Sequence, residues 1–114
     1  RLEEKETTFD IASCGMIGLE SCFGAVNKVL CVDNNIKIEK VIDSLTLKPR
    51  KIMGFNGDLF SLDAEAEITV IDDKQEWEFS SKDIESKSVN SPFIGELLIG
   101  KVLHTMSKNV LASI

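Results

Sequence analysis

The hydrophobic period of this chain changes once, near the turn pair Asn56-Gly57, and that change limits the folds available to it. Before the turn, apolar residues recur every three or four positions, which is the spacing of an amphipathic helix. After it, apolar and polar residues alternate, as in a strand with one buried face. Helices followed by strands predict an α+β fold, because a parallel α/β sheet needs strands and helices that alternate along the chain.

Three helical segments are expected before the turn. The first runs from Gly18 to Leu30 and is ended by the run 33–35, which is Asp-Asn-Asn. Its apolar stripe consists of Leu19, Cys22, Phe23, Val26, Val29 and Leu30. The second helix carries Ile38, Val41, Ile42 and Leu45 on one face. The third is a short turn of helix that begins at Pro49 and is ended by Gly54 as a left-handed cap. Glu20 falls in the first turn of the first helix, where a carboxylate suits the positive end of the macrodipole, so we expect a structural role for it.

The second half predicts strands. Residues 66–72 alternate and form one strand, and Trp77 and Phe79 belong to a second short strand. Residues 97–106 form a last strand, bent or interrupted at Gly100. Between them, residues 80–96 are expected to be irregular, with one turn of helix near 81–84.

Composition excludes several classes of protein. The net charge of −6, from 13 basic and 19 acidic residues, argues against a nucleic-acid partner, which would need clustered Lys and Arg. No apolar run reaches the roughly 18 residues that a membrane-spanning helix requires. The three cysteines are odd in number and lack a C-x-x-C spacing, so they are expected to be reduced thiols of a cytosolic protein.

The residues of this chain do not assemble a catalytic or metal-binding set. A zinc site needs several His, Cys or carboxylate ligands, whereas this chain has one histidine, His104, in a predicted strand. Cys14 between Ser13 and Gly15 invites interpretation as a nucleophile, but no histidine lies nearby in sequence to act as its base. A fold that brought His104 to Cys14 would change this, so the alternative stays open. No glycine-rich phosphate-binding motif is present.

Three stretches together resemble the C-terminal portion of dihydroorotases, in the amidohydrolase superfamily. The first is residues 9–20, FDIASCGMIGLE, which is similar to F-x-x-A-P-x-G-x-x-G-L-E. The second is residues 49–55, PRKIMGF, which is like the family's N-P-A/R-K-I-x-G-L. The third is residues 86–95, SKSVNSPFIG, which is like S-K-S-x-N-T-P-F-x-G and favours dihydroorotases over hydantoinases and allantoinases. The chain departs from the family at Ser13, where the family has proline, and at Lys48, where it has asparagine.

The resemblance implies three regions. Residues 1–17 would be the active-site loop, residues 18–56 the last helices of the (β/α)8 barrel, and residues 57–114 a small C-terminal β segment. Within the loop, it implies that Cys14 and Gly15 contact the substrate through their backbone. Arg1 would follow the family's D-H-A-P-H motif, whose aspartate shuttles protons, and the zinc ligands would lie further upstream. The chain itself is therefore expected to hold no catalytic residue and no metal ligand.

For the complete protein, the resemblance implies a zinc-dependent cytoplasmic enzyme of pyrimidine biosynthesis. It would interconvert dihydroorotate and N-carbamoyl-aspartate with a zinc-activated hydroxide, while this fragment alone would be inactive. Its expected partners are the substrate, the rest of the barrel and, as a further candidate, a second copy in a homodimer, without nucleic acid or membrane. Two alternatives stay open: a non-catalytic dihydroorotase-like scaffold for a pathway partner such as aspartate carbamoyltransferase, and an independent small α+β binding module.

Overall fold

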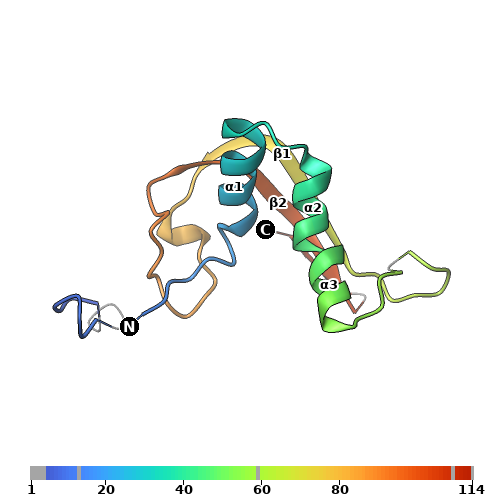
Figure 1. Ribbon diagram of the computed structural model, residues 1–114, viewed down its shortest axis with the longest axis horizontal. Helices are drawn as coiled ribbons and strands as arrows, with labels where there is room; N and C mark the ends of the chain where they lie inside the picture. The colour runs from blue at the N-terminus through green and yellow to red at the C-terminus, as the bar shows by residue number, and fades with distance from the viewer. Residues whose placement is uncertain (1–4, 13, 59, 109, 114) are drawn as a thin grey trace.

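The computed structural model describes residues 5–12, 14–58, 60–108 and 110–113 of the chain. Its α-helices come first and its strands second, so the expected α+β fold is confirmed (Figure 1). The helical elements are α1 (Cys22–Asn27), the π-helix η1 (Lys28–Asp33), α2 (Ile38–Leu45) and α3 (Leu47–Met53). The second half consists of β1 (Ile68–Glu78), the 3-10 helix η2 (Ser81–Asp83), β2 (Leu97–Ser107) and β3 (Val110–Ser113).

The strands form one antiparallel sheet in the order β1-β2-β3. Strand β1 pairs with β2 from Ile68 opposite Met106 to Glu78 opposite Leu97. Its register shifts twice, after Val70 and between Asp72 and Glu76. The prediction of two strands at 66–72 and 76–79 was therefore wrong. They are one long strand, because a bulge adds unpaired residues without ending the ladder. Strand β3 was not predicted, since four residues are too few to show a clear alternation.

The first helix begins later than its apolar stripe suggested. Helix α1 starts at Cys22 rather than Gly18, and Leu19 is 85% exposed. Its helical path then continues through η1 to Asp33. Because Glu20 precedes the helix, its expected role at the helix dipole was wrong. The apolar period could not locate this start, since a stripe marks a helix face and not the residue where hydrogen bonding begins.

Helix α3 confirms the predicted glycine cap. Gly54 has a φ of +71°, and the N–H groups of Gly54 and Phe55 donate to the carbonyls of Lys51 and Arg50 at 3.3 and 2.9 Å. This is the Schellman arrangement that satisfies the last carbonyls of a helix. The helix begins at Leu47, two residues before Pro49, so the start predicted from the proline was displaced.

Helix α1 packs directly on β2, and two glycines allow the close approach. A Cβ atom built on Gly24 would lie 2.8 Å from the carbonyl oxygen of Gly100. Gly100 itself has a φ of +100°, which explains the expected bend in β2. Beside this contact, Asn27 Nδ2 donates to the carbonyls of Asp73 and Ile99 at 2.8 and 2.9 Å. The buried Asn27 thus binds both the bulge of β1 and the bend of β2.

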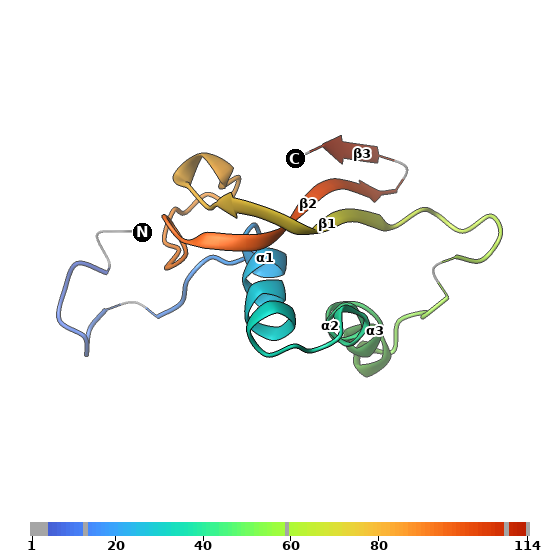
Figure 2. The ribbon, with the colours of Figure 1, turned by 90° about the horizontal axis from the view of Figure 1, so that it is seen from above.

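Helices α1, α2 and α3 lie on one side of the sheet (Figure 2). The core is small: among the residues that the structure describes, the buried apolar side chains are Phe23, Val41, Phe79 and Leu98. The accessible surface is 8733 Å², whereas a compact protein of this mass exposes about 6200 Å². The radius of gyration is 16.4 Å, against about 13 Å for a compact domain of this length. In the described parts, no helix is long and apolar enough to cross a membrane.

Candidate functional site

The loop at residues 14–20 lies against the segment at residues 86–90, and the contact joins the first and third sequence motifs. The carbonyl of Gly15 accepts a hydrogen bond from Asn90 Nδ2 at 2.9 Å. Two residues further on, the N–H of Ile17 donates to the carbonyl of Asn90 at 3.0 Å. Gly15 and Asn90 are 75 positions apart in the sequence. The fold therefore brings together two motifs that sequence reasoning could only place on separate loops.

Glu20 ties the other end of this loop to the same segment. Its Oε1 accepts hydrogen bonds from the Ser86 hydroxyl at 2.6 Å and from the Ser86 N–H at 2.8 Å. The hydrogen bond from the Ser86 hydroxyl is the main cause that holds the pKa of Glu20 below its usual value of 4.5. The other oxygen, Oε2, is buried and has no hydrogen-bond partner among the described residues. Glu20 therefore fastens two loops instead of capping a helix.

The predicted substrate-contacting pair, Cys14 and Gly15, lies on the exposed surface of this loop. Gly15 has a φ of +97°, and a Cβ atom built there meets nothing within 4 Å. Its carbonyl also accepts a hydrogen bond from Lys5 Nζ at 2.7 Å. Residues 1–4 of the expected loop region, and Ser13 with its departure from the family pattern, lie outside the described residues.

His104 has a polar partner on the neighbouring strand. It lies on β2, and its Nδ1 is 3.0 Å from the hydroxyl of Ser113 on β3. The hydrogen bonds of the described residues do not join His104 to Cys14. Within the same residues, no group of three or more His, Cys, Asp and Glu side chains could hold a metal ion.

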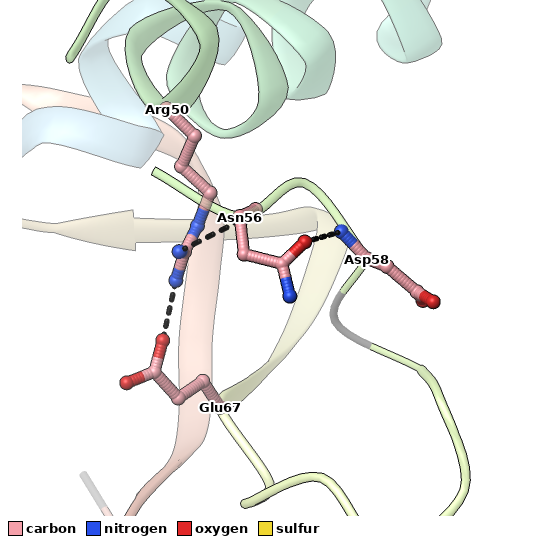
Figure 3. A network of polar contacts seen from close by, with 4 residues as sticks. All are labelled: Arg50, Asn56, Asp58 and Glu67. Atoms are coloured by element: carbon pink, nitrogen blue, oxygen red, sulfur yellow. Dashed lines mark hydrogen bonds and ion pairs between the residues drawn. The ribbon is translucent and has the colours of Figure 1, made fainter. Parts of the chain in front are cut away.

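The second motif forms a structural joint between α3 and the sheet (Figure 3). Arg50 forms an ion pair with the carboxylate of Glu67, just before β1, and its Nη1 donates to the carbonyl of Asn56 at 3.4 Å. The side-chain oxygen of Asn56 then accepts the N–H of Asp58 at 3.0 Å. The network holds the chain where it leaves α3 and returns toward the sheet.

Glu20 also lines a groove of about 630 Å³, which was not predicted from the sequence. Its lining includes Trp77 from β1 and Lys101 from β2, whose Nζ lies 5.1 Å from the centre of the Trp77 ring. Glu20, Lys82 and Asp83 add charges of both signs to its rim. Because the lining combines an aromatic ring with charges of both signs, it does not indicate one class of ligand.

Comparison with known proteins shows which sequences share this chain's pattern. The chain is 38% identical over 104 residues to a protein named dihydroorotase from Elusimicrobium minutum, covering 91% of the chain and 24% of that protein. It is 40% identical over 100 residues to the dihydroorotase of Chlorobaculum tepidum, covering 88% of the chain and 23% of the relative. It is 35% identical over 106 residues to that of Staphylococcus epidermidis, with 93% and 25% covered. No protein-family model matches. The chain thus spans about a quarter of the length of these relatives.

Proposed function

We propose that this chain, which is homologous to dihydroorotases over about nine-tenths of its length, forms the C-terminal portion of a dihydroorotase. The similarity to relatives of that name is the observation that carries the proposal. One feature of the structure supports it: the first and third motifs that resemble the family are joined by hydrogen bonds, from Ser86 to Glu20 and from Asn90 to Gly15.

The complete protein would catalyse the reversible ring opening of dihydroorotate to N-carbamoyl-aspartate, in cytoplasmic pyrimidine biosynthesis. Enzymes of this kind use zinc to activate water. The resemblance to the family implies that the zinc ligands lie in another part of the protein, upstream of this chain. The contribution of this chain would be to shape the substrate pocket and to complete the fold around it.

Within that protein, we assign residues 1–17 to the active-site loop, 18–56 to the last helices of a (β/α)8 barrel and 57–114 to a C-terminal β segment. The main chain at Cys14 and Gly15 would meet the pyrimidine ring. Two observations support this role: the pair is exposed, and Gly15 has no side chain to keep a ligand away from its backbone. The rest of the barrel would also cover the apolar surface left open on α3, where Ile52 is 83% exposed.

The direct experiment is an assay of the complete protein in both directions with zinc supplied. We expect hydrolysis of dihydroorotate and cyclisation of N-carbamoyl-aspartate, both abolished by a chelator and restored by zinc. The 114-residue chain alone should stay at the buffer rate. A complete, zinc-loaded protein without activity would refute the proposal, and binding of that protein to aspartate carbamoyltransferase would then favour the scaffold alternative.

Variants of the loop test the substrate-contacting pair. Cys14→Ala should retain most activity, because its contact comes from the backbone. Gly15→Val should raise the KM for dihydroorotate about tenfold or more without loss of zinc, the equivalent of about 1.4 kcal/mol. Its φ of +97° will also strain the valine, by about 1–2 kcal/mol.

Gly54→Val is the matched control for that strain. Gly54 also has a positive φ, of +71°, with open space around it, but it caps α3 instead of lying on the loop. We expect Gly54→Val to lower the melting temperature and leave the KM unchanged. If Gly15→Val keeps the wild-type KM, or Cys14→Ala abolishes turnover, the assignment of the pair is wrong.

A further inference from the structure

Asn90, in the third motif, is the residue that holds the loop at two points. Its side-chain amide donates to the carbonyl of Gly15 at 2.9 Å, and its own carbonyl accepts the N–H of Ile17 at 3.0 Å. The Asn90 backbone is itself fixed locally, since its N–H donates to the hydroxyl of Ser88 at 3.3 Å. Asn90 thus forms hydrogen bonds to the main chain on both sides of Met16.

The orientation of the Gly15 carbonyl has to be fixed by hydrogen bonds from outside the residues next to it. At a φ of +97°, glycine has many other backbone conformations of similar energy, so its local sequence does not fix the direction of the carbonyl. Lys5 also donates to this carbonyl, at 2.7 Å. A lysine side chain, however, gives up about 2 kcal/mol of rotamer entropy to hold one position, which limits how firmly it can orient a partner. The shorter Asn90 side chain has fewer torsions to immobilise, so it is better suited to orient this peptide.

We propose that Asn90 is a positioning residue for substrate binding, which orients the Cys14–Gly15 main chain toward the substrate by holding the Gly15 carbonyl and the Ile17 N–H. The inference rests on the proposed function, since it needs the pair to contact dihydroorotate. Asn90 acts through the loop and takes no part in the chemistry. Its loss should therefore affect the binding of substrate more than turnover of the bound substrate.

The test is Asn90→Ala in the complete, zinc-loaded protein. Loss of one neutral hydrogen bond should raise the KM for dihydroorotate about 3- to 10-fold, with kcat and zinc content close to wild type. Hydrogen exchange at the amides of residues 15–18 should become faster, because the loop samples more conformations. The matched control is Asn34→Ala, which removes a similar amide-to-carbonyl bond, from Asn34 Nδ2 to Val29 at 2.6 Å, at the end of η1. The control should leave both the KM and the exchange of the loop unchanged.

Each outcome is decisive. If the wild type is active and Asn90→Ala keeps its KM, the positioning role is wrong while the proposed function stands. A fall in kcat and melting temperature without a change in KM would show that Asn90 only supports the fold, and would also overturn the inference. If the wild type has no dihydroorotase activity, the proposed function fails, and the inference falls with it.

Discussion

Substitution of Gly24 by alanine should loosen the contact between α1 and β2, although alanine favours helices. The new Cβ atom would lie 2.8 Å from the carbonyl oxygen of Gly100 and 3.1 Å from the Cβ of Leu98. Ordinary van der Waals contact begins at 3.4 Å, so the helix and the strand would have to separate by about 0.6 Å. The obstructing atom is a backbone oxygen, which cannot move aside as a side-chain end would.

The expected loss of stability follows from three opposing effects. Overpacking of a tight contact costs about 1–3 kcal/mol. Separation also stretches the two hydrogen bonds of Asn27 to β1 and β2, each worth about 1 kcal/mol. Against these, alanine in place of glycine favours a helix interior by about 1 kcal/mol. The net effect should be a destabilisation of about 2 kcal/mol at this joint.

Hydrogen exchange in the complete protein measures this locally. A loss of about 2 kcal/mol corresponds to roughly 30-fold faster exchange of the protected amides in α1 and in β2 near Gly100. Gly57→Ala is the control, because a Cβ atom there meets nothing within 4 Å and its φ is not in the left-handed region. Wild-type or slower exchange in Gly24→Ala would refute the argument, since helix propensity would then outweigh the clash.

Three further predictions concern other joints and the open surface. Because the pKa of Glu20 is lowered in the folded protein, its hydrogen bonds to Ser86 should be complete above pH 4.5 and be lost as the pH falls through the lower folded-state pKa. An NMR titration of the Ser86 amide should show this transition, and Glu20→Gln should abolish the pH dependence. The pair of Arg50 and Glu67, with side chains 26% and 44% exposed, should contribute no more than about 1 kcal/mol in a double-mutant cycle of unfolding, and a coupling of several kcal/mol would contradict its exposure. The 114-residue chain alone should self-associate in sedimentation experiments, because its surface is far larger than that of a compact domain; a monomer that unfolds cooperatively would count against this.

Local signals in the sequence predicted those features that depend on near neighbours. The order of helices and strands, the cap of α3 at Gly54 and the bend of β2 at Gly100 all appear in the structure as expected. A period of apolar residues or a glycine in a left-handed conformation reports the backbone within a few residues, which is why these predictions held. The same signals misplaced the starts of α1 and α3 and divided β1 at its bulge, since helix starts and bulges also depend on packing.

The contacts that build the candidate site were decided only by the tertiary structure. Asn90 reaches Gly15 across 75 positions, Ser86 reaches Glu20 across 66, and Asn27 reaches Ile99 across 72. An asparagine or a glutamate can bond any suitable group that the fold brings near, so its own sequence neighbourhood does not name its partner. The sequence motifs indicated which segments belong to the candidate site. The packing of α1 on the sheet, and of the loops beside it, determined which atoms form hydrogen bonds there.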